Sequence, residues 1–193
     1  MTALTLRGSA SSILIVMLCA GVCGCITTDW NETQTKGTRE GYEAFVARYP
    51  DSSYSSRARA RIATFKREEE ENRRRIDKAV TSGDVHGLYV MKAGADEISK
   101  ALKEHWTPLA GDSPDSIFLK STLLPLMGNI TSMTDSCFIS SITTKESQSY
   151  SAVISKLTFD KNIDFAFFPK AIIGGRSFET MCYYQGVWFA KTE

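Results

Sequence analysis

The stretch GYEAFVARYPDSSYSSRARARIATF, residues 41–65, decides the first part of the fold. Four apolar side chains recur at the spacing of one helical face: Tyr42, Phe45, Val46 and Tyr49. Pro50 ends that helix, and the following PDSS sequence is typical of a turn. Four more apolar side chains then share one face of a second helix: Tyr54, Ala58, Ile62 and Phe65. Two amphipathic helices across a short turn predict an antiparallel helical hairpin.

Sequence on either side of the stretch sets the expected limits of the hairpin. Thr38 is a predicted N-cap for the first helix, and the polar residues 25–37 are expected to form a tether. The charged run EEEENRRR, residues 68–75, has no apolar side, so we expect the second helix to stand in solvent there. Ser82 and Gly83 end it. The predicted hairpin therefore covers residues 38–82, within a helical region of 38–108.

Trp30, followed by GTREGYEAFVARYPDSSYSSRARARI, resembles the tetratricopeptide-like unit that is common in bacterial envelope lipoproteins. The resemblance covers about a fifth of the chain and implies a surface that binds other polypeptides. Only one copy is recognisable, and roughly three are needed for independent stability. Two alternatives stay open: the hairpin packs on its own C-terminal domain, or it forms a groove for a protein partner. The expected partner surface consists of Tyr42, Phe45, Tyr49 and Tyr54.

The first 24 residues have the features of a signal peptide. Arg7 is the only charged residue before Asp29, and ILIVMLCA, residues 13–20, is an unbroken apolar run followed by small residues. The run is too short to cross a bilayer alone, although a short transmembrane anchor is the alternative interpretation. We expect residues 1–24 to be removed.

The sequence VCGC, residues 22–25, resembles the lipobox of bacterial lipoproteins, with Gly24 before the modified cysteine. The resemblance implies lipidation of Cys25, and several acyl chains on one residue would hold the chain firmly on a membrane. Ile26, rather than an aspartate, follows Cys25, which by the same resemblance favours the periplasmic face of the outer membrane. Removal of Arg7 leaves as many basic as acidic residues.

Two cysteines remain in the rest of the chain, Cys137 and Cys182. In an oxidising compartment they could form a disulfide, which would close a loop of about 45 residues and contribute roughly 4 kcal/mol. Two buried free thiols are the alternative, because sequence does not show whether the residues meet.

The second half of the chain, residues 109–193, is expected to form a small antiparallel β-rich domain. Five segments rich in β-branched and aromatic residues predict strands: 137–144, 149–159, 164–168, 177–184 and 187–191. Gln185 and Gly186 occupy the place of a two-residue hairpin turn. The whole chain is therefore predicted to be α+β, with the hairpin packed on or linked to the sheet.

No catalytic constellation is apparent in the sequence. The two histidines, His86 and His105, lie on separate predicted helices without metal-ligand spacing around them, so we expect neither metal nor cofactor. The net charge of +1 gives no general attraction to nucleic acid. We expect a non-enzymatic, membrane-anchored interaction module with an envelope protein as partner. The alternative is a lipid, glycan or peptide site, or an inhibitor domain, lined by the many aromatic residues of the sheet.

Overall fold

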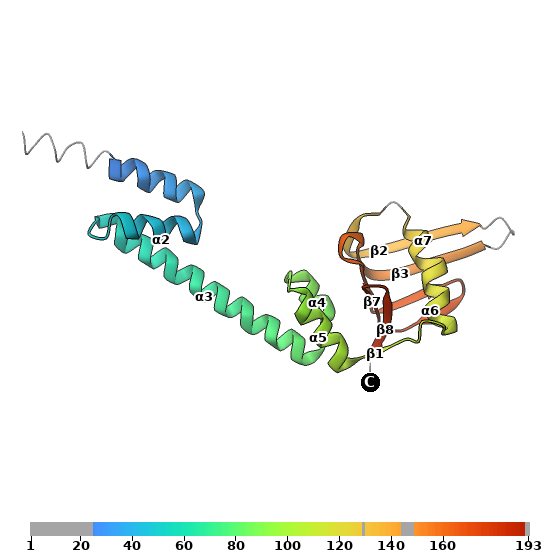
Figure 1. Cartoon of the computed structure of the whole chain (residues 1–193). Helices are drawn as coiled ribbons and strands as arrows, with labels where there is room; N and C mark the ends of the chain where they lie inside the picture. The colour runs from blue at the N-terminus through green and yellow to red at the C-terminus, as the bar shows by residue number, and fades with distance from the viewer. Residues whose placement is uncertain (1–24, 129, 144–148, 192–193) are drawn as a thin grey trace, which may run out of the picture. The chain divides into compact units, whose positions relative to one another are not determined.

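The computed structural model describes residues 25–128, 130–143 and 149–191 (Figure 1). The predicted α+β class is confirmed, with helices in the N-terminal part and a curled antiparallel sheet in the C-terminal part. The chain divides into two compact units, one up to Asn72 and one from Arg73 onward. The boundary falls inside a helix, α3, and each unit is described separately below.

The first unit contains the predicted hairpin. Helix α2 (Arg39–Arg48) and helix α3 (Ser53–Ser82) confirm the two expected helices and their turn. The Thr38 hydroxyl accepts a hydrogen bond from the backbone N–H of Gly41 at 3.2 Å, so Thr38 is the N-cap. Residues 66–75 of α3 are all exposed, as the charged run predicted.

The expected tether is wrong, because residues 25–36 form a helix. Its inward face carries Ile26, Trp30 and Thr33, which lie four and three residues apart and are partly or fully buried. Glu32 and Lys36 form an i,i+4 ion pair of 2.8 Å on its exposed side. The segment is therefore an amphipathic helix whose apolar face is short and partly polar.

The second unit begins in α3 and continues through helix α4 (Val85–Val90) and helix α5 (Ala95–His105). Helix α6 (Pro114–Phe118), a π-helical turn (Leu119–Leu123) and helix α7 (Leu124–Met127) form one continuous helical run. The eight strands of the sheet are β1 (Trp106–Pro108), β2 (Ser132–Thr143), β3 (Ser149–Asp160), β4 (Phe165–Phe168), β5 (Lys170–Ile173), β6 (Arg176–Phe178), β7 (Met181–Tyr184) and β8 (Val187–Lys191). A 3₁₀ turn, Lys161–Ile163, follows β3.

The register shows that β4 and β5 are two parts of one interrupted strand, and that β6 and β7 are two parts of another. Ser155 pairs with Lys170 and Thr158 pairs with Phe167, so β4 and β5 meet β3 in one register, interrupted at Pro169. In the same way β6 and β7 keep a single register against β5 and β4. The sheet is thus a meander that starts at β2, and β1 is added beside β8 at the far edge.

Both faces of the sheet carry packed helices. The run from α6 to α7 covers one face through Leu119, Leu123 and Met127, which lie in a core with Phe168 and Trp188. The end of α3 together with α4 and α5 covers part of the opposite face, in a second core that contains the sheet residues Phe165, Cys182 and Tyr184. Alternate residues of β4 face the two cores, as the period of a strand requires.

The expected domain boundary at residues 108 and 109 is therefore not a boundary in the structure. Strand β1, which ends at Pro108, pairs with β8 in the sheet, and α4 and α5 share a core with it. The compact units meet at Asn72 and Arg73 instead. The helical region of 38–108 thus belongs partly to each unit.

Candidate binding cleft around helix α4

The partner surface expected on the hairpin is covered by the chain itself. Trp30 packs edge-on against Phe45, with ring centroids 5.2 Å apart, and stacks on Tyr54 at 5.3 Å. Tyr42 and Phe45 are buried, and Tyr49 and Tyr54 are half-buried. The proposed use of these four residues as a partner surface is wrong, because the helix over residues 25–36 occupies the face that they form.

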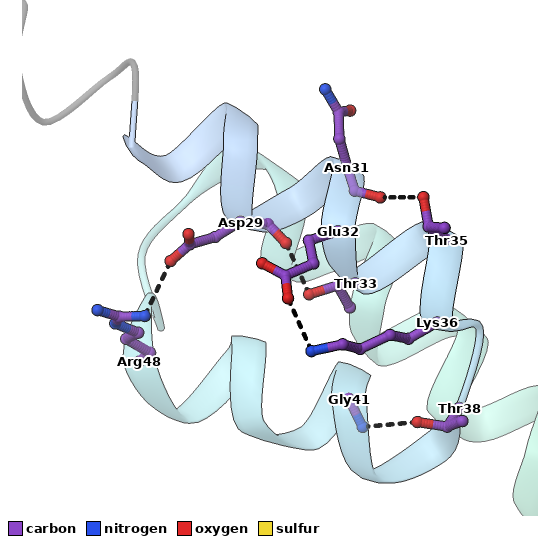
Figure 2. A network of polar contacts seen from close by, with 9 residues as sticks. All are labelled: Asp29, Asn31, Glu32, Thr33, Thr35, Lys36, Thr38, Gly41 and Arg48. Atoms are coloured by element: carbon purple, nitrogen blue, oxygen red, sulfur yellow. Dashed lines mark hydrogen bonds and ion pairs between the residues drawn. The ribbon is translucent and has the colours of Figure 1, made fainter.

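Polar contacts hold that helix in place (Figure 2). The Asp29 carboxylate accepts hydrogen bonds from Arg48, at 2.9 Å, and from the Tyr49 hydroxyl, at 2.5 Å. Both donors lie at the C-terminal end of α2, where the basic Arg48 also suits the helix dipole. The Thr33 hydroxyl donates to the backbone carbonyl of Asp29 at 2.8 Å, within the helix itself. One carboxylate therefore fastens the N-terminal helix to the hairpin.

The expected disulfide between Cys137 and Cys182 is absent, since both are free thiols. Cys137 is exposed on β2, whereas Cys182 is fully buried on β7. Strands β3 and β4 lie between them in the sheet, a separation of roughly 14 Å, which no disulfide spans. Burial raises the pKa of the Cys182 thiol, which makes it an inert core side chain. Cys25 is exposed, as the first described residue of its helix.

The aromatic residues of the sheet do not line an open cup. Most of them are buried in the two cores beneath the helices: Phe159, Phe165, Phe168, Phe178, Tyr184 and Trp188. Phe167, Tyr183 and Phe189 are partly buried against the same cores. The excess of aromatic residues is explained by a sheet that carries helices on both faces.

Helix α4 lies beside an irregular part of the β2–β3 pair. The backbones of Asp135 and Lys156 have positive φ angles of 54° and 56°, and the register shifts on both sides of Ser136. These features are β-bulges, which bend a strand and redirect its side chains. The bulge lets the Asp135 N–H donate to the hydroxyl of the buried Thr158 at 3.3 Å. A bulged strand end and a short helix thus meet at this place.

His86 is the central polar side chain of this meeting point. Its Nε2 atom lies 3.0 Å from the Thr158 hydroxyl and 4.0 Å from the Asp135 carboxylate. The imidazole stacks on Phe167, with ring centroids 5.0 Å apart. Sequence reasoning did not single out His86, because its neighbours here come from strands about fifty to eighty residues away in the chain.

Two hollows flank α4, and Val90 lines both. One, of about 460 Å³, is lined by Tyr89, Val90, Lys92, Ala93, Ile98, Thr134, Asp160 and Ile163. The other, of about 500 Å³, is lined by Arg75, Lys78, Ala79, Ser82, Asp84, His86, Gly87, Val90, Met91 and Asp135. Val90 and Ile163 are 53% and 43% exposed, so apolar surface is open to solvent here. We call the two hollows together the α4 cleft.

The cleft has side chains of both charge signs around its apolar part. Lys92 and Asp160 line the first hollow, and Arg75, Lys78 and Asp84 line the second. The Tyr89 hydroxyl donates to the Asp160 carboxylate at 3.1 Å. Burial, and then this hydrogen bond, raise the pKa of Tyr89 above its ordinary value. The cleft therefore offers apolar contact, cations and carboxylates to a bound surface.

The polar groups of the cleft do not form a nucleophile–base arrangement. In a triad the acid contacts the ring nitrogen opposite the one that faces the nucleophile. Here Thr158 and Asp135 both approach the same atom, Nε2 of His86. The Thr158 oxygen is also fully buried, so a substrate cannot reach it. Among the described residues no group of three or more His, Cys, Asp or Glu side chains is placed to hold a metal ion.

Comparisons with protein-family models, with curated proteins and with solved structures find no match to this chain. Of the helices in the described residues, none is both long and apolar enough to cross a membrane.

Proposed function

We propose that this protein is a non-enzymatic lipoprotein of the bacterial envelope that binds a protein partner through the α4 cleft. The observation that carries the binding proposal is the exposed apolar pair, Val90 and Ile163, beside charges of both signs. Open surfaces with an apolar centre and a polar rim are typical of protein interfaces. Small-molecule sites are usually enclosed and bury most of their ligand. Two open hollows along a helix do not have this form, so they favour a protein partner.

Two observations support the anchored part of the proposal. The VCGC sequence places Cys25 where a lipobox cysteine stands, at the end of a signal-like segment. In the structure Cys25 is exposed and is the first described residue of the helix that packs on the hairpin. A diacylglyceryl group on its sulfur would thus join the membrane directly to a folded unit, without a flexible tether.

The partner proposal is tested with Val90→Asp in the full-length chain, in its bacterial host. Ile117→Asp is the matched control, because Ile117 is also 53% exposed but lies on α6. We expect one stoichiometric envelope protein to cross-link to the wild type and to the control, and to be lost with Val90→Asp. Equal recovery with both variants would place the partner elsewhere. If no protein is captured by any variant, the alternative of a lipid, glycan or peptide ligand takes its place.

The anchor is tested with Cys25→Ser, by membrane fractionation and by incorporation of labelled palmitate. We expect the wild type to be shortened, labelled and membrane-bound, and the variant to be unlabelled. A variant that remains labelled and shortened would contradict lipidation at Cys25.

A further inference from the structure

Strand β2 forms an open edge of the sheet. It pairs with β3 along its length, and no strand among the described residues pairs with its other side (Figure 1). An unpaired edge of this kind offers a row of backbone N–H and C=O groups that another extended strand can pair with. The chemistry of the edge therefore selects a β-strand as its occupant.

The regular half of β2 lacks the features by which edges are usually protected. Residues 138–143, FISSIT, contain no proline and no charged residue. The bulge and the nearby Asp135 lie at the other end of the strand. Pairing from Phe138 to Thr143 with β3 is free of register shifts. This half of the strand is consequently regular, uncharged and free of an intrachain strand partner on its outer side among the described residues.

An exposed apolar row runs across the sheet and ends at this edge. Ile139 lies opposite Val153 on β3, and Val153 lies opposite Ile172 on β5. These side chains are 72%, 48% and 51% exposed. They point away from the core that α6 and α7 cover, because the alternate residues Phe138, Ala152 and Ala171 belong to that core. Ile139 is thus both an edge residue and the end of an apolar row.

We propose that β2 pairs in antiparallel fashion with β2 of a second copy of this chain. A two-fold axis perpendicular to the sheet relates such strands, so the same face of both sheets points the same way. The two rows that end at Ile139 then join into one continuous row across the dimer. Because residues 138–143 carry no charge, self-pairing brings no like charges together. A strand of another protein would also have to be uncharged and regular along this length, whereas β2 of a second copy has the same uncharged, regular sequence.

The first test measures the oligomeric state of the full-length chain in detergent by sedimentation equilibrium. We expect a dimer for the wild type and for Ile117→Lys. Ile139→Lys should raise the dimer dissociation constant at least about tenfold, because it places two lysines near the two-fold axis. Its melting temperature checks that the sheet still folds. A monomeric wild type, or a dimer that Ile139→Lys leaves unchanged, would overturn the proposal.

A second test needs no destabilising substitution. If the pairing is centred on Ser140, so that Ser140 lies opposite Ser140 of the second copy, the two Cys137 residues are separated by about six strand positions, roughly 20 Å, within reach of a flexible bismaleimide of about that length. Cys137 is exposed and Cys182 is buried, so the reagent reaches Cys137. We expect a cross-linked dimer in cells that Cys137→Ser abolishes. Absence of a cross-linked dimer in the wild type, or a cross-linked dimer that persists in Cys137→Ser, would count against pairing through β2.

Discussion

Gly83 is a residue whose conformation and contacts leave no room for a side chain. Its φ angle is +66°, in the region that favours glycine. A Cβ atom there would lie 2.5 Å from the Cβ of His105, and the Gly83 carbonyl accepts a hydrogen bond from the Trp106 indole at 3.0 Å. The end of α3 thus meets the end of α5 at a single glycine.

Gly83→Ala should therefore destabilise the second unit by about 2–4 kcal/mol, since both the backbone strain and the clash must be relieved. Denaturant unfolding monitored by circular dichroism measures this loss. Gly111→Ala is the control, because nothing lies within 4 Å of a Cβ at Gly111, and it should change stability little. Equal effects of the two substitutions would show that the close approach at Gly83 is unimportant.

The buried thiol of Cys182 should make the folded state less stable as the pH becomes alkaline. Burial raises the pKa of its thiol in the folded state above the ordinary value of about 9, so the unfolded state loses its proton first. Burial of the neutral thiol therefore contributes fully to the free energy of unfolding below that pH. Above it this contribution is lost, by up to about 1.4 kcal/mol per pH unit. We expect urea midpoints measured from neutral to alkaline pH to fall more steeply in the wild type than in Cys182→Ala. Parallel pH profiles would contradict this account.

At the scale of elements, the helix over residues 25–36 completes the hairpin. A lone pair of amphipathic helices leaves an apolar face open, and this chain covers it with Trp30 from the preceding helix. The buried cluster formed by Trp30, Tyr42, Phe45 and Ala58 has all its members in the first unit. The hairpin needs no second helical pair here because a third helix supplies the missing neighbour.

Trp30→Ala should cost about 3–5 kcal/mol in the first unit, the range for truncating a buried large side chain. We expect loss of helical signal at lower temperature and binding of an apolar dye to the uncovered hairpin. Asn31→Ala, one position further on and exposed, is the matched control and should behave like the wild type. An intact hairpin without the Trp30 side chain would mean that the helix is dispensable.

Local sequence patterns predicted most helices and strands. Each element that they missed has an identifiable physical reason. The hairpin helices and the turn at Gln185 and Gly186 follow from periodicity and turn chemistry, and both turn residues have positive φ. The helix over residues 25–36 was missed because Thr33 occupies its apolar stripe. Strands β1 and β5 were missed because one is three residues long and the other follows Pro169.

At the scale of the whole molecule, the described residues form three buried clusters. One lies within the first unit, and two lie on the faces of the sheet in the second unit. The exposed stretch of α3 from 66 to 75 adds no buried residue to any of them. Each unit therefore has its own apolar core, which is the usual requirement for separate folding.

We expect hydrogen exchange to show this division. Phe45→Ala should lower amide protection from residue 26 to residue 65 and leave the strands of the sheet unchanged. Leu102→Ala, on α5 and in the core between the helices and the sheet of the second unit, should do the opposite. Mass spectrometry of peptic fragments measures both patterns. Loss of protection throughout the chain in either variant would show that the two units unfold as one.

The sequence by itself determined the α+β class, the helical hairpin and the exposure of the charged run, because these depend on contacts between residues close in the chain. Only the tertiary structure decided that Trp30 covers the hairpin, that Cys137 and Cys182 stay apart, and that His86 meets Thr158 and Asp135. It also decided which strand is left at the open edge. These features depend on strand order and on packing between distant segments, which local periodicity does not encode.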